Sequence, residues 1–184
     1  MSNEKNPTRV VTGKVRLSYV NAFKAKSIAD GQDPKYSVSI IIDKKDKDTI
    51  KRINAAIAAA TEAGKDKLAV KGVMPKVIKN PLRDGDEERS DDEAYAGKLF
   101  INANSKSKPE VIDVDKNEIT DPLDLYSGCY GRVSINFYAF NQNGNKGIAA
   151  GLGNIQKLAE GEPLGSVFSA SNDFDDDFDN EDDL

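Results

Sequence analysis

The fold is decided by an alternating stretch late in the chain, Tyr130-Gly131-Arg132-Val133-Ser134-Ile135-Asn136-Phe137-Tyr138-Ala139-Phe140. Its apolar residues share one parity: Val133, Ile135, Phe137 and Ala139. Polar and aromatic residues occupy the other: Tyr130, Arg132, Ser134, Asn136, Tyr138 and Phe140. Side chains alternate between the two faces of a strand, so this period of two predicts a long, half-buried β-strand. Residues 141–145 form a turn rich in Asn and Gly, and the glycine-rich, apolar residues 146–155 are expected to return as its hairpin partner.

Other strands are predicted upstream of this hairpin. Residues 9–23 alternate between an apolar or aromatic face (Val11, Val15, Leu17, Tyr19) and a polar, basic face (Thr12, Lys14, Arg16, Ser18). After a turn at 30–34, the β-branched run 36–42 predicts an antiparallel neighbour. Residues 98–104 and 110–114 predict two more strands. In the first, Lys98, Phe100 and Asn102 face away from Leu99, Ile101 and Ala103.

One helix is predicted between these strands. Within residues 43–63, apolar residues recur at helical spacing: Ile50, Ile53, Ala56, Ile57 and Ala60. Acidic residues lie near the start of this segment, and Gly64 follows its end. Residues 65–97 are punctuated by Pro and Gly and contain a charged run at 84–93. We interpret them as a long, partly mobile loop insertion.

These elements predict a mainly β protein. Five or six strands with one inserted α-helix favour an OB-fold-like barrel over an alternating α/β sheet. The expected organisation is a flexible N-terminus (1–8), an OB-fold-like domain (9–160) and an acidic, disordered tail (161–184).

The charge is divided unequally along the chain. All 26 Lys and Arg residues lie within residues 1–157, together with 21 of the 31 acidic residues, so the body is positive although the whole chain carries −5. Residues 169–184 have acidic side chains, no basic ones and little apolar content. Such a segment cannot bury enough surface to offset its ordering entropy. Its apolar side chains are the predicted partner-binding residues of the tail: Phe174, Phe178 and Leu184.

Composition excludes several classes of site. Cys129 is the only cysteine and histidine is absent, which excludes an intramolecular disulfide and a Cys/His zinc site. Cys129 is expected to be a small buried hydrophobe. No apolar run approaches the length of a membrane span, so we expect no membrane partner. We also expect no cofactor and no metal.

Binding of nucleic acid without reading its sequence needs cations for phosphates and exposed aromatic rings for bases. The strand parities predict both, because Tyr130, Arg132 and Tyr138 lie opposite apolar residues, as do Lys98 and Phe100. The alternative is that these rings pack in the core or at an end of the barrel. Candidate phosphate contacts are Lys14, Arg16, Lys24, Lys26, Lys76, Lys79, Arg83, Lys106 and Lys108.

An enzymatic reading rests on the carboxylates between Asp84 and Glu93. They could hold Mg²⁺ for nuclease chemistry, which needs two or three carboxylates converging on the metal. They lie, however, in a segment with no predicted rigid scaffold, and the usual histidine base is absent. We therefore expect a protein that is not an enzyme.

Several stretches occur together in this chain: residues 12–19 (Thr-Gly-Lys-Val-Arg-Leu-Ser-Tyr), 83–86 (Arg-Asp-Gly-Asp), 125–132 (Leu-Tyr-Ser-Gly-Cys-Tyr-Gly-Arg), 136–140, 146–148 and 151–157. Their combination resembles a family of phage-encoded single-stranded DNA-binding proteins. The resemblance implies an OB-fold related to the T7-type protein and a role in phage replication, recombination and repair. An acidic tail ending in an apolar residue is shared with that class, although Leu184 stands where several relatives have phenylalanine.

The sequence thus predicts sequence-independent binding of single-stranded DNA in the cytoplasm of a bacterial host. The tail is expected to compete with DNA for the groove and to recruit replication or recombination proteins. The oligomeric state stays open, with a homodimer as one alternative. Two other functions are alternatives: a protein-interaction scaffold whose tail mimics nucleic acid, and a metal-dependent nuclease.

Overall fold

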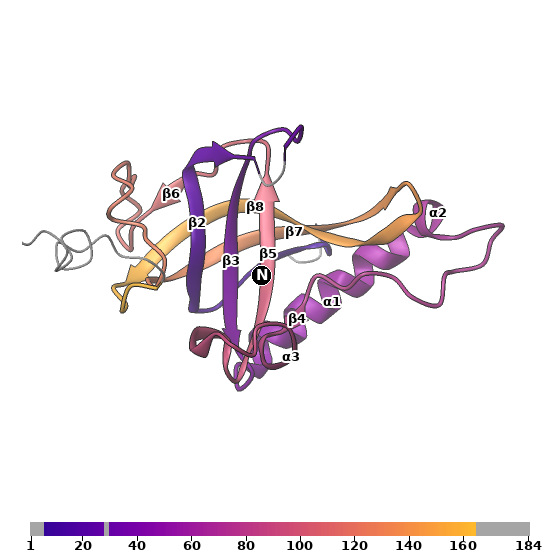
Figure 1. Ribbon diagram of the computed structural model, residues 1–184, viewed down its shortest axis with the longest axis horizontal. Helices are drawn as coiled ribbons and strands as arrows, with labels where there is room; N and C mark the ends of the chain where they lie inside the picture. Colours follow the sequence, from indigo (N-terminus) through magenta and orange to yellow (C-terminus); the bar gives the residue numbers. More distant parts are fainter. Residues whose placement is uncertain (1–5, 28–29, 165–184) are drawn as a thin grey trace, which may run out of the picture.

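One sheet organises the protein in the computed structural model, which describes residues 6–27 and 30–164. Within these residues the sheet has eight strands: β1 (Arg9–Val11), β2 (Val15–Lys26), β3 (Lys35–Asp43), β4 (Arg83–Asp84), β5 (Lys98–Ser105), β6 (Val111–Ile112), β7 (Tyr130–Gln142) and β8 (Asn145–Ala159). The helices are α1 (Lys47–Ala63), α2 (Lys65–Leu68), α3 (Gly85–Glu88) and the 3₁₀ turn η1 (Glu93–Tyr95) (Figure 1).

The five long strands are paired in a ring. β2, β3 and β5 are antiparallel neighbours, β5 runs parallel to β8, and β7 pairs with both β8 and β2. The β5–β8 and β2–β7 junctions hold only two residue pairs each, so the sheet is ring-like and not a continuous barrel. The mainly β, OB-fold-like prediction is confirmed. β4 was not predicted, and the strand predicted over residues 9–23 is divided into β1 and β2.

The predicted core face of the hairpin is confirmed. Val133, Ile135 and Phe137 of β7 are buried inside the ring with Leu17 of β2 and Ile40 of β3. β7 and β8 stay in register from Asn141 to Val133 with one irregularity. This alternation therefore leaves the opposite face of β7 outside the ring.

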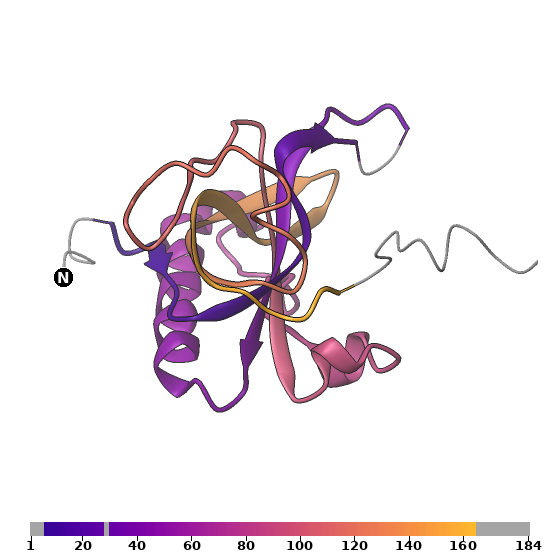
Figure 2. The same ribbon diagram turned by 90° about the vertical axis from the view of Figure 1, so that its left-hand side faces the viewer.

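The predicted helix is also confirmed. The Asp46 side chain accepts a hydrogen bond from the Thr49 backbone N–H and caps α1 at its N-terminus. The buried side of α1 carries Ile53, Ala56 and Ala60 and packs against β7. At the other end of α1, a side chain at Gly64 would clash with Ala139. Figure 2 shows α1 and residues 85–97 on opposite sides of the ring.

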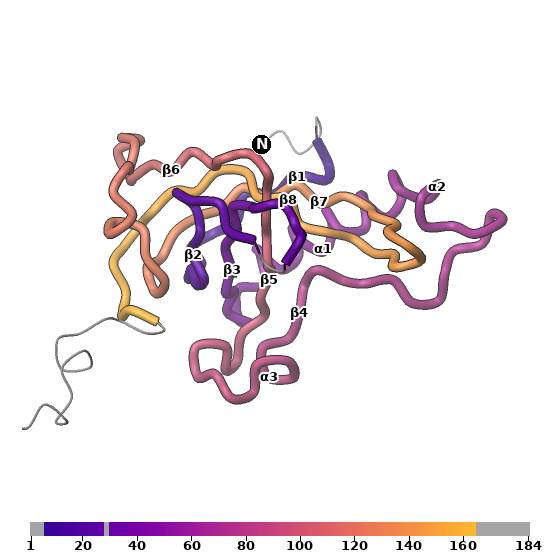
Figure 3. Tube along the Cα trace, turned by 45° about the horizontal axis from the view of Figure 1, so that its top comes forward, coloured from indigo at the N-terminus to yellow at the C-terminus, as the bar shows by residue number. Residues whose placement is uncertain are grey.

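The loop insertion divides into two unlike parts. Residues 69–82 run out beyond α2 and return to β4 with little regular pairing (Figure 3). Residues 83–97, in contrast, are fixed to the body, because β4 pairs with β5 and Tyr95 is fully buried. This second part of the predicted loop insertion contains β4, α3 and η1 and packs on the sheet.

Candidate nucleic-acid interface

A band of small polar side chains crosses the outer face of the sheet. Asn21 of β2 is paired with Ser37 of β3, Ser37 with Asn104 of β5, and Asn104 with Gly151 of β8. Directly paired residues project from the same face, so these four lie in one row. Asn102, one step along β5, also faces outward and is exposed. We call Asn21, Ser37, Asn102, Asn104 and Gly151 the polar band.

Tyr138 stands at the β7 end of the polar band. Its ring lies 3.5 Å from the position of a Cβ at Gly151, and 44% of the residue is exposed. The missing side chain at Gly151 leaves the face of the band open beside this ring. Tyr138 therefore has the predicted outward position, with a ring free for stacking.

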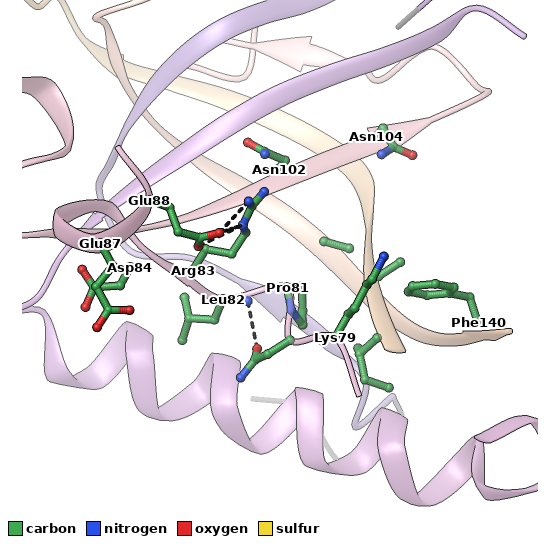
Figure 4. Close-up of a pocket in the computed structure, with 14 residues that line it drawn as sticks. Lys79, Pro81, Leu82, Arg83, Asp84, Glu87, Glu88, Asn102, Asn104 and Phe140 are labelled. Carbon is green, nitrogen blue, oxygen red and sulfur yellow. Dashed lines mark hydrogen bonds and ion pairs between the residues drawn. The ribbon is translucent and has the colours of Figure 1, made fainter. Parts of the chain in front are cut away.

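A hollow of about 700 Å³ lies next to the band, where β5 and β8 diverge. Figure 4 shows Asn102 and Asn104 on one side and Lys79 close to Phe140 on the other. Lys79 is held there because its backbone N–H donates to Lys146 and its carbonyl accepts from Ile148. The hollow thus combines amides, an exposed cation and an aromatic ring.

Arg83 lines the same hollow, but its charge is paired with a carboxylate. Its guanidinium forms a bidentate ion pair with Glu88, with the closest N–O distance 2.6 Å, and lies 5.2 Å from the centre of the Phe100 ring. The sequence placed Arg83 among the candidate phosphate contacts without predicting this carboxylate partner.

Phe100 has the predicted parity but not the predicted exposure. It projects to the outer face, where it is fully buried in a small cluster with Ile41 and Tyr95. Residues 85–96 supply Tyr95, whose hydroxyl lies 2.9 Å from that of Ser39. The expectation of an exposed stacking ring at Phe100 is therefore wrong, because the charged insertion covers this part of the sheet.

Tyr130 is only half exposed. Lys14 and Arg16 lie over its ring, at 5.1 and 5.7 Å from the ring centre, so the predicted basic face of β2 does meet an aromatic residue. Arg16 also donates to the backbone carbonyls of Gly128 and Glu162. Residues 161–162 thereby cover the tyrosine and reduce the surface that a base could stack on.

Contacts of residues 161–164 define where the folded body ends. Leu164 donates its backbone N–H to Ser127 and packs against the cluster of Ile41, Tyr95 and Phe100. Residues 161–164 therefore belong structurally to the body, whereas the sequence assigned them to the tail. The predicted tail residues Phe174, Phe178 and Leu184 lie outside the described part of the chain.

The remaining predicted cations are scattered. Lys24 and Lys26 are exposed at the end of β2, and Lys106 and Lys108 follow β5. Lys76 lies on the outward excursion of residues 69–82. Three of the predicted cations have partners. Lys98 forms an ion pair with Asp43 at 2.9 Å, and Lys106 forms one with Asp33 at 3.8 Å. Arg132 donates to the Thr12 carbonyl.

Tyr19 was missed by sequence reasoning, which placed it on the core face with Leu17. Its φ is 46°, β2 changes register between Ser18 and Asn21, and 57% of Tyr19 is exposed. The bulge rotates the ring outward, next to the β2 end of the polar band. Arg89, also missed, lies 5.5 Å from the centre of this ring. Alternation alone carries no signal of a bulge.

Two of the carboxylates in the insertion are held by one lysine. Lys44 lies between Asp84, at 3.0 Å, and Asp86, at 2.8 Å. These hydrogen bonds lower the pKa of both carboxyls and raise the pKa of Lys44. Among residues 6–27 and 30–164, no group of three or more Cys, Asp or Glu side chains could hold a metal ion.

The fold is similar to that of the OB-fold-like single-stranded DNA-binding proteins of phages. Residues 8–184 match the family described as the single-stranded DNA-binding protein of Enterobacter phage Enc34, and the chain belongs to that family. Putative protein p50 of Acyrthosiphon pisum secondary endosymbiont phage 1 is 30% identical, over 91% of this chain and 93% of its own.

Solved structures agree with this assignment. The Enc34 protein in complex with single-stranded DNA is 26% identical, with a TM-score of 0.70 over 87% of this chain and 91% of that one. The fold is also similar to gp2.5 of bacteriophage T7, with 13% identity and a TM-score of 0.55 over 91% of this chain and 95% of gp2.5. In the described part of the chain, no helix has the length and apolarity to span a membrane.

Proposed function

We propose that this protein binds single-stranded DNA without sequence preference across the polar band. The observation that carries the proposal is the row of small side chains from Asn21 to Gly151, which leads to the exposed ring of Tyr138. In OB-folds the outer face of the second and third strands, with the hairpin of the last two, commonly binds oligonucleotides. Here these elements are β3, β5 and the β7–β8 hairpin.

The chemistry of the band favours binding without discrimination between bases. A tyrosine ring stacks on any base, and small amides allow the nucleotide backbone to approach the sheet closely. Lys79 beside the hollow and the exposed lysines after β2 and β5 are the proposed phosphate contacts. Their attraction is independent of base identity. The Enc34 relative solved with single-stranded DNA supports the same ligand class for this chain.

The acidic tail is proposed to gate this face. Leu164, the last described residue, packs against Ile41, Tyr95 and Phe100 on the outer face of β3 and β5. Residues 165–184 carry acidic and no basic side chains. Tethering keeps these charges at a high local concentration near the phosphate-binding cations. When DNA displaces the tail, its apolar residues become available to replication, recombination or repair proteins.

The protein is proposed to act as a binding protein in the cytoplasm of the phage host, with no catalytic step. A titration of labelled oligo-dT, with and without Mg²⁺, tests this directly. We expect a saturable complex and an intact oligonucleotide in both conditions. Cleavage that depends on Mg²⁺ would indicate a nuclease. Absence of any complex at low salt would favour a protein-interaction scaffold.

A further inference from the structure

Tyr19 and Arg89 form an unusual pair at the β2 end of the polar band. Tyr19 has a left-handed backbone, with φ of 46°, at the first of two irregularities in the pairing of β2 with β3. This conformation is disfavoured for a side chain with a Cβ, and residues held in it cluster at functional sites. Its structural result is an aromatic ring presented to solvent on the outer face.

Arg89 is held by rings, not by carboxylates. Its guanidinium lies 5.5 Å from the ring centre of Tyr19, 5.4 Å from that of Tyr95 and 5.5 Å from that of Phe100. Two acidic residues that precede it in the chain have other partners: Glu88 pairs with Arg83, and Asp86 pairs with Lys44. Among the described residues, Arg89 has no ion-pair partner within 4.0 Å. Its charge is therefore left for an incoming anion.

The pair is continuous with the polar band. The Asn21 amide donates both to the Tyr19 backbone carbonyl and to the Ser37 hydroxyl, so hydrogen bonds join the backbone at Tyr19 to the first residues of the band. Tyr19 and Tyr138 thus stand at the two ends of one row of small side chains. A strand laid along that row meets an aromatic ring at each end.

We propose that Tyr19 and Arg89 form a nucleobase-stacking site for single-stranded DNA. One base stacks on the exposed surface of the Tyr19 ring. Arg89 holds the ring by a cation–π contact and attracts the adjacent phosphate. The proposal rests on the function proposed above and deepens it. It adds a second stacking site at the opposite end of the band from Tyr138.

A tryptophan reporter tests the site, because the chain contains no tryptophan. In Tyr19→Trp, oligo-dT is expected to quench the single indole fluorescence as the base stacks on it. The matched control is Leu123→Trp, which places an indole at an 81% exposed position in the loop between β6 and β7, outside the band. Its fluorescence should stay nearly constant over the same titration.

A glycine variant separates stacking from folding. Tyr19→Gly relieves the left-handed backbone, so the melting temperature should stay equal or rise while oligo-dT affinity falls about 5-fold or more. Arg89→Ala should also weaken binding, and Arg89→Lys should restore part of the affinity.

The outcomes distinguish this site from the proposed function. Wild-type protein that fails to bind oligo-dT by anisotropy would overturn both. Wild-type binding together with an unquenched Tyr19→Trp and an unchanged affinity of Tyr19→Gly would overturn only the stacking site.

Discussion

Tyr95 packs edge to face against Phe100 on the outer side of the sheet, with the ring centres 5.1 Å apart and the ring planes at 82°. This contact covers the half of β3 and β5 nearest to β4 and leaves the half with Ser37 and Asn104 uncovered. Strand parity predicts that the Phe100 ring is exposed and can stack on a base. The contact with Tyr95 buries that ring instead.

Phe100→Ala is expected to destabilise the protein by about 3–5 kcal/mol, because it removes a fully buried ring and leaves a cavity. Urea denaturation followed by circular dichroism measures this loss. A variant as stable as wild type would contradict the burial of Phe100 described here.

Tyr138→Ala should have the opposite profile. Its ring is 44% exposed beside Gly151, so the melting temperature should change little. Loss of one stacked base, worth about 1–3 kcal/mol, should weaken oligo-dT binding roughly 5-fold or more. Fluorescence anisotropy with Tyr138→Phe as the control checks this, because phenylalanine keeps the ring. Equal affinities of the alanine variant and wild type would remove Tyr138 from the interface.

Binding should weaken steeply as salt rises. Each phosphate neutralised on a single strand contributes about −0.7 to the slope of log affinity against log salt concentration. Lys79→Ala should make that slope shallower, since Lys79 is exposed at the hollow, whereas Arg83→Ala should change it less because Glu88 already pairs with Arg83. A slope near zero for wild-type protein would refute an electrostatic interface.

Truncation after Val167 removes the eight acidic residues between Asp173 and Asp183. Affinity for oligo-dT at low salt should rise, and the gain should shrink as salt screens both the tail and the DNA. Anisotropy over a salt series measures both effects. Replacing the same acidic residues by Asn and Gln in the full-length chain is the control for length. An unchanged or lower affinity at low salt would eliminate the gating role.

Acid should loosen residues 83–97. Lys44 lowers the pKa of Asp84 and Asp86, so these ion pairs stabilise the fold above the ordinary carboxyl pKa of about 3.9. Their contribution disappears as the pH falls through the lowered values. The raised pKa of Lys44 keeps the lysine charged across this range.

The melting temperatures of wild type and Lys44→Met should therefore differ at pH 7 and converge toward pH 3. Lys76→Met, at an exposed position, is the control and should show no such convergence. A difference that stays constant with pH would argue against the ion pairs.

Local sequence patterns predicted the elements that bury a single face against the core. Side chains repeat every two residues along a strand and every 3.6 residues along a helix. The first period places Val133, Ile135 and Phe137 on one buried face, and the second does the same for Ile53, Ala56 and Ala60. These patterns were sufficient for the hairpin, the helix and the outward position of Tyr138.

The missed features depend on contacts between distant segments. No pattern in the sequence around Phe100 predicts that Tyr95 covers it. Tyr130 is covered in the same way by residues about thirty positions later in the chain. Tyr19 illustrates a different limit, because a single bulge reverses the parity of the residues beyond it. The residues of the polar band lie on four different strands. Only the register of these strands brings them into one row, and the sequence alone does not give that register.

Hydrogen–deuterium exchange of the full-length protein, with and without saturating oligo-dT, tests the central claim most directly. We expect added protection in β5 near Asn102 and Asn104, in the β7–β8 hairpin around Tyr138, and in β2 around Tyr19. Exchange in α1 and in residues 113–124 should stay unchanged. Protection confined to α1 or to residues 113–124, with the polar band unaffected, would contradict that claim.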